Sequence, residues 1–181
     1  MKNKVEIRKE VLIKLKKFEE NKSEKEEQTI EILSKLLKEE VFIKSKVIAL
    51  YMPQSFEFDL TLLFDNIKEK KILIPKVMEQ KKMIFTAFDE KNLIRSKFGI
   101  LETISSKEEY PDFILVPGLA WNAENYRIGF GGGYYDRYLK NFKGETMSLC
   151  YHFQKLDFEP EAHDVKIKEV IHALSRTKLQ S

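Results

Sequence analysis

One stretch of this chain decides how the rest is interpreted: Arg127-Ile128-Gly129-Phe130-Gly131-Gly132-Gly133-Tyr134-Tyr135-Asp136-Arg137-Tyr138-Leu139. It holds four of the seven glycines of the protein. Glycine adopts positive φ at little cost and lets the backbone approach a ligand closely. The stretch follows a strand-like run at 113–117 and leads into a helix-like run at 134–139. This arrangement predicts an anion cradle, in which backbone N–H groups precede the positive end of a helix.

Charged residues on both sides of the glycines extend this prediction. Arg127 offers a bidentate donor for a phosphate, and Asp136 could hold a metal ion on the same phosphates. The stretch lacks the Gly-Lys-Ser/Thr of a Walker A loop. It also lacks the dinucleotide-binding fingerprint, because Tyr134 stands where the last glycine would be. We therefore expect phosphate binding of another kind, with a purely structural turn as the less favoured alternative.

Hydrophobic patterns along the chain predict an α/β fold. Short apolar runs indicate strands at 46–51, 72–75, 83–88, 113–116, 146–151 and 170–173. Helical patterns cover 4–19, a second helix capped by Ser23 and Glu26, a third from Asp59 to about Lys68, and 134–141. The second helix carries Ile30, Leu33, Leu36 and Leu37, and the third is predicted to turn Leu62, Leu63 and Ile67 inward.

The order of these elements predicts a mostly parallel sheet with helices on both faces. The run at 83–88 follows the preceding strand too closely for a helical crossover, so we expect it to be antiparallel at an edge. Residues 89–111 are predicted to be irregular. Ligands bind beyond the carboxyl ends of strands in such sheets, so the glycine stretch and the loops at 51–57 and 75–76 are expected to share one rim.

Composition narrows the class of protein. With 181 residues and 43% hydrophobic content, the chain is expected to form one domain, residues 1–181. The net charge is +3, from 32 basic and 29 acidic residues, which does not indicate a nucleic-acid partner. No apolar run is long enough for a membrane span, and the charged N-terminus does not resemble a secretory signal. We expect a cytoplasmic monomer without nucleic-acid or membrane partners, in which the single cysteine, Cys150, is a buried thiol.

Several further residues have both a functional and a structural interpretation. Lys4 and Arg8 lie one helical turn apart and could reach phosphates, although surface charge is the simpler explanation. Glu57, in a partly apolar loop, could accept hydrogen bonds from an amino-pyrimidine ring or stand at a helix start. Asp164 could join Asp136 in holding Mg²⁺ or cap a turn. Trp121 could line a pocket or cap the core. The three histidines, which form no metal-binding spacing, are expected to be structural: His152, His163 and His172.

Residues 116–139 resemble the 5-formyltetrahydrofolate cyclo-ligase (methenyltetrahydrofolate synthetase) family. Looser resemblances to the same family follow in order along essentially the whole chain: Lys4-Val5-Glu6-Ile7-Arg8, Tyr51-Met52-Pro53, Glu57-Phe58-Asp59 and His163-Asp164-Val165. The resemblance implies a three-layer α/β/α fold similar to the ribose-phosphate isomerase and CoA-transferase group. It also implies a reaction in which 5-formyltetrahydrofolate and ATP give 5,10-methenyltetrahydrofolate, ADP and phosphate, with Mg²⁺.

The resemblance also implies roles for individual residues. ATP would be bound by Lys4, Val5, Glu6, Ile7, Arg8, Arg127, Ile128, Gly129, Phe130, Gly131, Gly132, Gly133, Tyr134 and Tyr135. Met52 and Glu57 would bind the folate, with Trp121 beside them and Tyr135 near both ligands. Arg127 and Tyr135 are the expected catalytic residues, and Asp136 and Asp164 would hold Mg²⁺.

The sequence departs from the family pattern at two positions and leaves two other functions open. Trp121 stands where phenylalanine is more frequent, and Phe130 fills a loop position that can be basic. The relative importance of the remaining cations is therefore open: Lys4, Arg8, Lys76 and Arg127. A sugar-phosphate isomerase on the same fold would need a carboxylate base instead of this loop. A folate- or nucleotide-binding regulator would have no need of a metal at the γ-phosphate.

Overall fold

A central sheet of six strands, in the order β10-β9-β6-β1-β2-β3, organises the computed structural model, which describes residues 2–174. The strands are β1 (Val47–Ala49), β2 (Lys71–Val77), β3 (Met83–Ala87), β6 (Phe113–Leu115), β9 (Glu145–Cys150) and β10 (Glu169–His172). All neighbouring strands are parallel except β2 and β3. The six predicted strands are confirmed, and so is the antiparallel edge position of residues 83–88.

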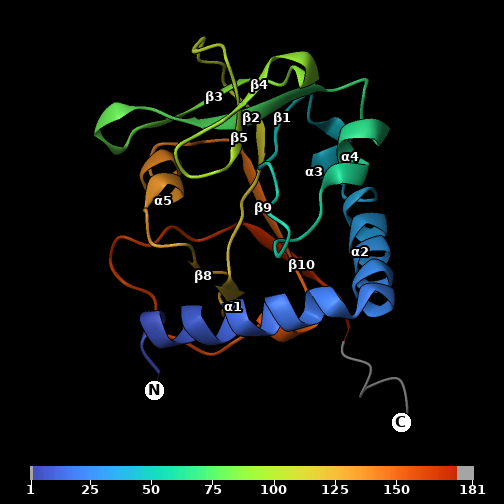
Figure 1. Ribbon diagram of the computed structural model, residues 1–181, viewed down its shortest axis with the longest axis vertical. Coiled ribbons are helices and arrows are strands. Elements are labelled where there is room, and N and C mark those ends of the chain that lie inside the picture. The colour runs from blue at the N-terminus through green and yellow to red at the C-terminus, as the bar shows by residue number, and fades with distance from the viewer. Residues whose placement is uncertain (1, 175–181) are drawn as a thin grey trace.

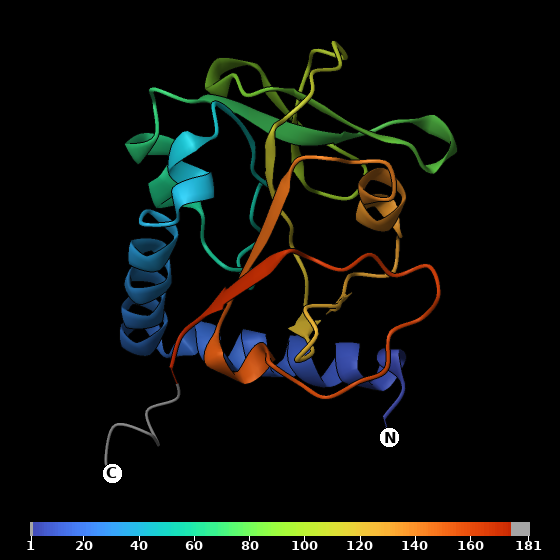
Figure 2. The ribbon, with the colours of Figure 1, turned by 180° about the vertical axis from the view of Figure 1, so that it is seen from behind.

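Helices cover both faces of this sheet. The helices are α1 (Lys4–Glu20), α2 (Lys22–Leu36), α3 (Glu40–Lys44), α4 (Thr61–Asn66) and α5 (Tyr134–Leu139). Successive residues of a strand point to opposite faces, so Ile48 packs in the core beneath α1 to α4, whereas Ala49 packs in the core that includes α5. Figures 1 and 2 show α1 running across one end of the molecule, with α2 rising beside it and α5 on the opposite side of the sheet.

The two N-terminal helices begin at asparagine caps. The Asn3 side chain accepts hydrogen bonds from the backbone at the start of α1 and forms a capping box with Glu6. Asn21 caps α2, so the predicted cap at Ser23 and Glu26 is wrong: Asn21 already accepts a hydrogen bond from the Glu24 backbone N–H, and the helix starts earlier. Along α2 the buried side chains are Gln28, Thr29, Ile32, Leu33 and Leu36, whereas Ile30 and Leu37 are exposed. Of the positions predicted to face inward at α4, Leu63 and Ile67 are buried, but Leu62 is exposed.

Residues 89–111 contain a hairpin and are not irregular, which corrects the prediction. Strands β4 (Leu93–Arg95) and β5 (Leu101–Thr103) pair antiparallel, and Gly99 adopts a φ of 75° in the connecting turn. The base of the hairpin is held by the Lys76 ammonium group, which donates to the carbonyls of Thr103, Ile104 and Ser105 at 2.8 to 3.0 Å. Strands this short carry too few residues for a clear alternating pattern.

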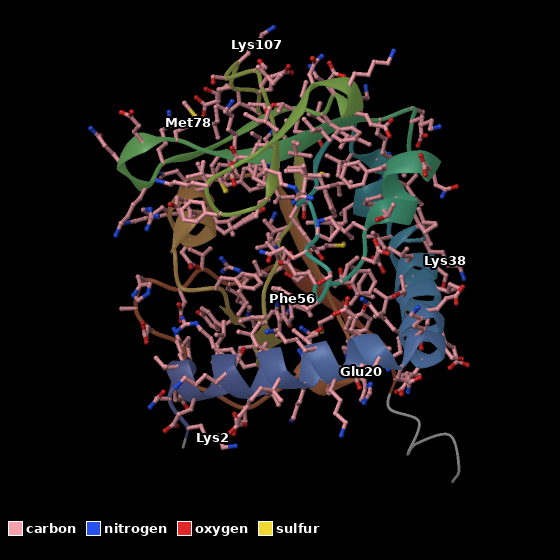
Figure 3. The ribbon with its side chains drawn as sticks, in the orientation of Figure 1. Lys2, Glu20, Lys38, Phe56, Met78 and Lys107 are labelled. Carbon is pink, nitrogen blue, oxygen red and sulfur yellow. The ribbon has the colours of Figure 1, made fainter. Side chains whose placement is uncertain are left out.

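Smaller elements complete the chain. A second hairpin joins β7 (Ala120–Trp121) and β8 (Arg127–Ile128), and three 3₁₀ turns cover Glu79–Lys81, Glu90–Asn92 and His152–Gln154. Helix α4 is shorter than predicted because it ends at Asn66, although Asp59 does accept the Thr61 backbone N–H at 2.8 Å. None of the helices in residues 2–174 is long and apolar enough to cross a membrane. In Figure 3, Lys2, Lys38 and Lys107 extend from the periphery of the protein.

Candidate active site

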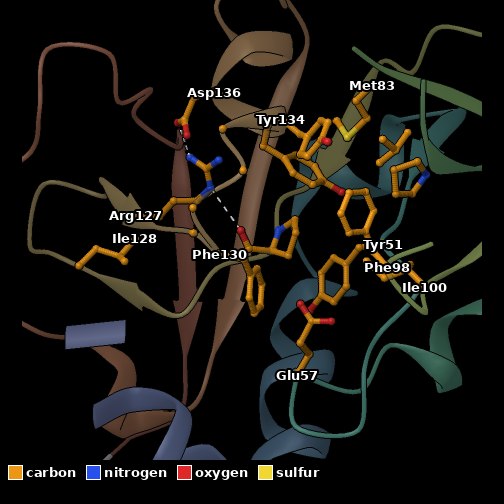
Figure 4. Close-up of a pocket in the computed structure, with 18 of the residues that line it drawn as sticks. Tyr51, Glu57, Met83, Phe98, Ile100, Arg127, Ile128, Phe130, Tyr134 and Asp136 are labelled. Atoms are coloured by element: carbon orange, nitrogen blue, oxygen red, sulfur yellow. Dashed lines mark hydrogen bonds and ion pairs between the residues drawn. The ribbon is translucent and has the colours of Figure 1, made fainter. Parts of the chain in front are cut away.

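One cavity of about 530 Å³ lies beyond the carboxyl ends of β1, β2 and β6. It is lined by residues after β1, at the end of β2, after β6 and throughout the glycine stretch 127–136. The predicted convergence on one rim is therefore confirmed. Lys76 is the exception, because its ammonium group is bonded to the three hairpin carbonyls and lies outside the cavity lining. Figure 4 shows the cavity between Arg127 and Asp136 on one side and Phe98 and Ile100 on the other.

Arg127 is built into the charged end of this cavity. Arg127 is only 4% exposed. Its Nη1 donates to Asp136 Oδ1 at 2.8 Å and its Nε to the Pro117 carbonyl at 3.2 Å (Figure 4). Asp136 Oδ1 also accepts the Val165 backbone N–H at 3.3 Å. These contacts hold Arg127 rigidly beside the glycine loop, and a rigid planar cation is suited to a phosphate group.

The N-terminal helix brings two more cations to the same end. Lys4 Nζ lies 2.5 Å from Asp164 Oδ2 and 3.5 Å from Glu161, while Arg8 Nε donates to the Gly129 carbonyl at 2.9 Å. The predicted shared face of Lys4 and Arg8 is confirmed, since both line the cavity.

The three residues between these cations do not reach the cavity. Val5 is 58% exposed, the Glu6 carboxylate accepts the Asn3 backbone N–H, and Ile7 is buried in the core. Among the ATP-binding residues expected at 4–8, only Lys4 and Arg8 line the cavity. The reason is helical periodicity: side chains one turn apart share a face, and the residues between them point elsewhere.

The glycine loop has the backbone conformation that requires glycine. Gly131 and Gly133 have φ of 97° and 66°, a region that side chains disfavour. At Gly132 a Cβ atom would lie 2.8 Å from the Tyr134 ring. The glycines of this loop therefore border the cavity with backbone that carries no side chain, as the anion-cradle prediction requires.

The opposite part of the cavity is largely apolar and contains one carboxylate, Glu57. Its Oε2 accepts the Gln54 backbone N–H at 2.8 Å. Burial raises the pKa of Glu57 from 4.5 to about 7, against the lowering effect of that hydrogen bond. Met52 lines the cavity beside it. Glu57 can therefore gain or lose a proton near neutral pH and can accept hydrogen bonds from a ring with N–H donors.

Tyr135 lies between the two ends. Its hydroxyl is buried and has no hydrogen-bond partner among the described residues, and Arg127 lies 6.0 Å from its ring centre. Burial and the charge of Glu57 raise the pKa of Tyr135, and the charge of Arg127 lowers it. The phenol is thus a neutral donor at physiological pH. A buried hydroxyl without a hydrogen-bond partner costs free energy, and a ligand in the cavity that accepts its hydrogen bond would remove that cost.

Trp121 does not reach the cavity, which corrects the expectation that it lines the pocket. It lies in β7, is 1% exposed and is absent from the cavity lining. A Cβ atom at Gly118 would lie 2.9 Å from the indole ring, so the tryptophan fills the core against that glycine. Its core position leaves the expected folate contact at Trp121 without geometric support.

The structure adds lining residues that sequence reasoning missed. The β4–β5 hairpin contributes Phe98, Ile100 and Glu102, and the segment before Asp164 contributes Glu161 and His163. Phe98 is half exposed and its ring centre lies 6.4 Å from that of Tyr134. The only signal for the hairpin was the turn glycine, Gly99, because the flanking strands are three residues each.

The residues present fit a magnesium ion. Asp136 and Asp164 line the same cavity. Carboxylate oxygens are the hard ligands that Mg²⁺ prefers, with waters and phosphate oxygens completing its shell. Each carboxylate is paired with a cation within the protein, Arg127 and Lys4 respectively.

The mostly parallel α/β sheet carries one cavity at its carboxyl edge, with a glycine-lined cationic end and a largely apolar end, which is the usual place and form of a small-molecule site in an enzyme of this fold class. The family model described as the 5-formyltetrahydrofolate cyclo-ligase family matches residues 1–173, and the chain belongs to that family. It is accordingly a ligase with the three-layer α/β fold of its relatives.

Individual relatives agree with this assignment. A 5-formyltetrahydrofolate cyclo-ligase of Mycoplasma pneumoniae is 33% identical over 70% of this chain and 73% of its own length. The NMR structure of Aquifex aeolicus 5,10-methenyltetrahydrofolate synthetase has a TM-score of 0.80 at 37% identity, covering 93% of this chain and 89% of that one. A 5,10-methenyltetrahydrofolate synthetase structure from Mycoplasma pneumoniae gives a TM-score of 0.73 at 28% identity, over 94% and 98% of the two chains.

Proposed function

We propose that this protein converts 5-formyltetrahydrofolate to 5,10-methenyltetrahydrofolate, consuming ATP with Mg²⁺ and releasing ADP and phosphate. The observation that carries the proposal is the continuity of one cavity. It runs from the cationic glycine loop to the partly apolar region around Glu57, with the unpaired Tyr135 hydroxyl between them. Such a cavity can hold two different ligands with their reactive groups in contact.

The cationic end is assigned to the phosphates of ATP. Backbone N–H groups of the glycine loop, together with Lys4, Arg8 and Arg127, supply donors and positive charge around one region of the cavity. Phosphoryl transfer depends mainly on positioning and on neutralisation of charge. Mg²⁺ held by Asp136 and Asp164 would supply further neutralisation at the phosphates.

The region around Glu57 is assigned to the pterin ring. Its aminopyrimidine part carries an amine and a ring N–H, and a carboxylate accepts both hydrogen bonds in a paired geometry. Met52 and Tyr51 supply apolar surface for the flat ring. Glu57 therefore orients the folate so that its formyl group faces Tyr135 and the phosphates.

The reaction follows in two steps from this arrangement. The formyl oxygen attacks the γ-phosphorus and ADP leaves, which produces an iminophosphate. The N10 atom then attacks the formyl carbon and loses its proton, and phosphate departs with the former formyl oxygen. Arg127 and the loop N–H groups stabilise the charge that develops on the phosphoryl oxygens, and the Tyr135 hydroxyl donates to the oxygen that is transferred.

An absorbance assay tests this function directly. Purified protein is mixed with 5-formyltetrahydrofolate, ATP and Mg²⁺, and the near-ultraviolet band of the methenyl product is followed while each component is omitted in turn. Product that requires both ATP and Mg²⁺ supports the proposal. Binding of ATP and folate without product would favour a regulator, and turnover of a sugar phosphate without ATP would favour an isomerase.

A further inference from the structure

A second cavity adjoins the main one at its folate end. It has a volume of about 310 Å³ and is lined by Met52, Pro53, Gln54, Ser55, Arg95, Gly99, Ile100 and Leu101. Met52, Gln54 and Ile100 also line the main cavity, so the two share a wall. This side cavity lies between the loop after β1 and the β4–β5 hairpin, two elements that the proposed chemistry leaves partly unused.

The lining of the side cavity is positively charged. Arg95 is its only charged lining residue among those that the structure describes. The Arg95 side chain is exposed, donates from Nη1 to the Gly99 carbonyl at 2.9 Å, and forms no ion pair within residues 2–174. Lys25 reaches the same loop from α2 and donates to the Ser55 carbonyl at 2.9 Å. The side cavity is therefore suited to an anion.

The size of the main cavity gives a second reason to expect that a ligand extends from it into the side cavity. Its volume of about 530 Å³ lies in the lower half of the range of roughly 300–1,000 Å³ that pockets provide for a single ligand of drug size. The proposed reaction places two such molecules side by side. Part of one of them must therefore leave the main cavity, and the folate end opens beside Arg95.

We propose that the side cavity binds the glutamate tail of the folate and that Arg95 pairs with its carboxylates. Reduced folate is a pterin joined through an aminobenzoyl group to glutamate, so its anionic end lies opposite the ring that Glu57 orients. The aminobenzoyl group passes along Ile100, which lines both cavities. A planar guanidinium is the best partner for a carboxylate, and Arg95 is thus a specificity-determining residue. This inference rests on the proposed folate reaction.

The test compares two substrates and three variants. 5-Formyltetrahydrofolate is compared with 5-formyltetrahydropteroate, which ends at the benzoate and lacks the glutamate. Arg95→Gln is expected to lower the ratio of kcat/KM for the intact over the truncated substrate about tenfold, mainly through KM for the intact one. Arg95→Lys, which keeps the charge, is expected to restore most of that ratio. Lys91→Gln removes a charge from an exposed residue that lines neither cavity and serves as the matched control.

Each outcome separates the tail site from the proposed function. If the wild type turns over the intact substrate and Arg95→Gln leaves the ratio unchanged, the tail site is refuted and the function stands. An equal loss with both substrates, or the same loss in Lys91→Gln, also refutes it, because general charge or folding would then explain the effect. If the wild type turns over no folate with ATP and Mg²⁺, the proposed function fails and the tail site with it.

Discussion

The partly buried carboxyl group of Glu57 makes the stability of the free protein depend on pH. Its pKa is raised by burial from 4.5 to about 7. The folded protein therefore holds a proton between these two values that the unfolded chain has lost. The contribution of this group to the free energy of unfolding is fully present below pH 4.5, and it is lost as pH rises through about 7. At about 1.4 kcal/mol for each pH unit, the loss is about 3 kcal/mol.

The perturbation is Glu57→Gln, which keeps an oxygen to accept the Gln54 N–H and removes the ionisation. We expect the variant to unfold with a free energy about 3 kcal/mol higher than the wild type at pH 8, and with little difference near pH 4.5. For a chain of this size, roughly 2–4 °C per kcal/mol predicts a gap in melting temperature of about 10 °C at pH 8.

The assay is urea or thermal unfolding of both proteins without ligand, in steps between pH 4.5 and pH 8. Glu90→Gln is the control, because Glu90 is exposed and lines neither cavity. A difference between Glu57→Gln and wild type that stays constant across this range would refute the reasoning. A second readout follows from the proposed pterin contact: folate affinity in the wild type should rise with pH through about 7, and this rise should be absent in Glu57→Gln.

Three further predictions concern the cationic end of the cavity, where we propose that ATP binds. Arg127→Lys should lower kcat about 100-fold, because lysine keeps the charge but loses the fixed planar donor; an unchanged kcat in the absorbance assay would remove Arg127 from the chemistry. Gly131→Ala, at a φ of 97°, should cost at least about 1 kcal/mol of stability and raise KM for ATP, as urea unfolding and steady-state kinetics would show; an equally stable variant would contradict the strain argument. Chelation with EDTA should abolish turnover yet hardly change the melting temperature, because the carboxylates are already paired with Arg127 and Lys4; a large thermal shift would give the metal a structural role.

Much of the fold follows from local pattern in the sequence. Short apolar runs bounded by proline or polar residues are buried strands, and all six of the central sheet could be located from them. The hairpin at 93–103 could not be, since two strands of three residues present almost no alternation. Asn21 as the cap of α2 was also missed, because several polar residues in a row can serve as a cap and only the path of the chain selects one.

The candidate site, too, was predictable from sequence where local pattern decides and unpredictable where distant segments meet. The glycine stretch could be recognised from composition, because a cluster of glycines suits backbone that adopts positive φ or approaches a ligand closely. Lys4 and Arg8 could be assigned to one face from helical spacing. Their contacts with Asp164 and Gly129, more than 100 residues away, depend on how α1 packs across the sheet. Spacing along the chain carries no information on such contacts.

The sequence by itself determined the six strands of the central sheet, the position of the glycine loop and the family to which the chain belongs, since these depend on residues close together in the chain. Tertiary structure alone decided that Trp121 lies in the core, that Lys76 holds the hairpin, and that Arg95 lines the side cavity. It also decided the proton affinity of Glu57. Burial is a property of everything packed around a side chain, and that packing exists only once distant segments have come together.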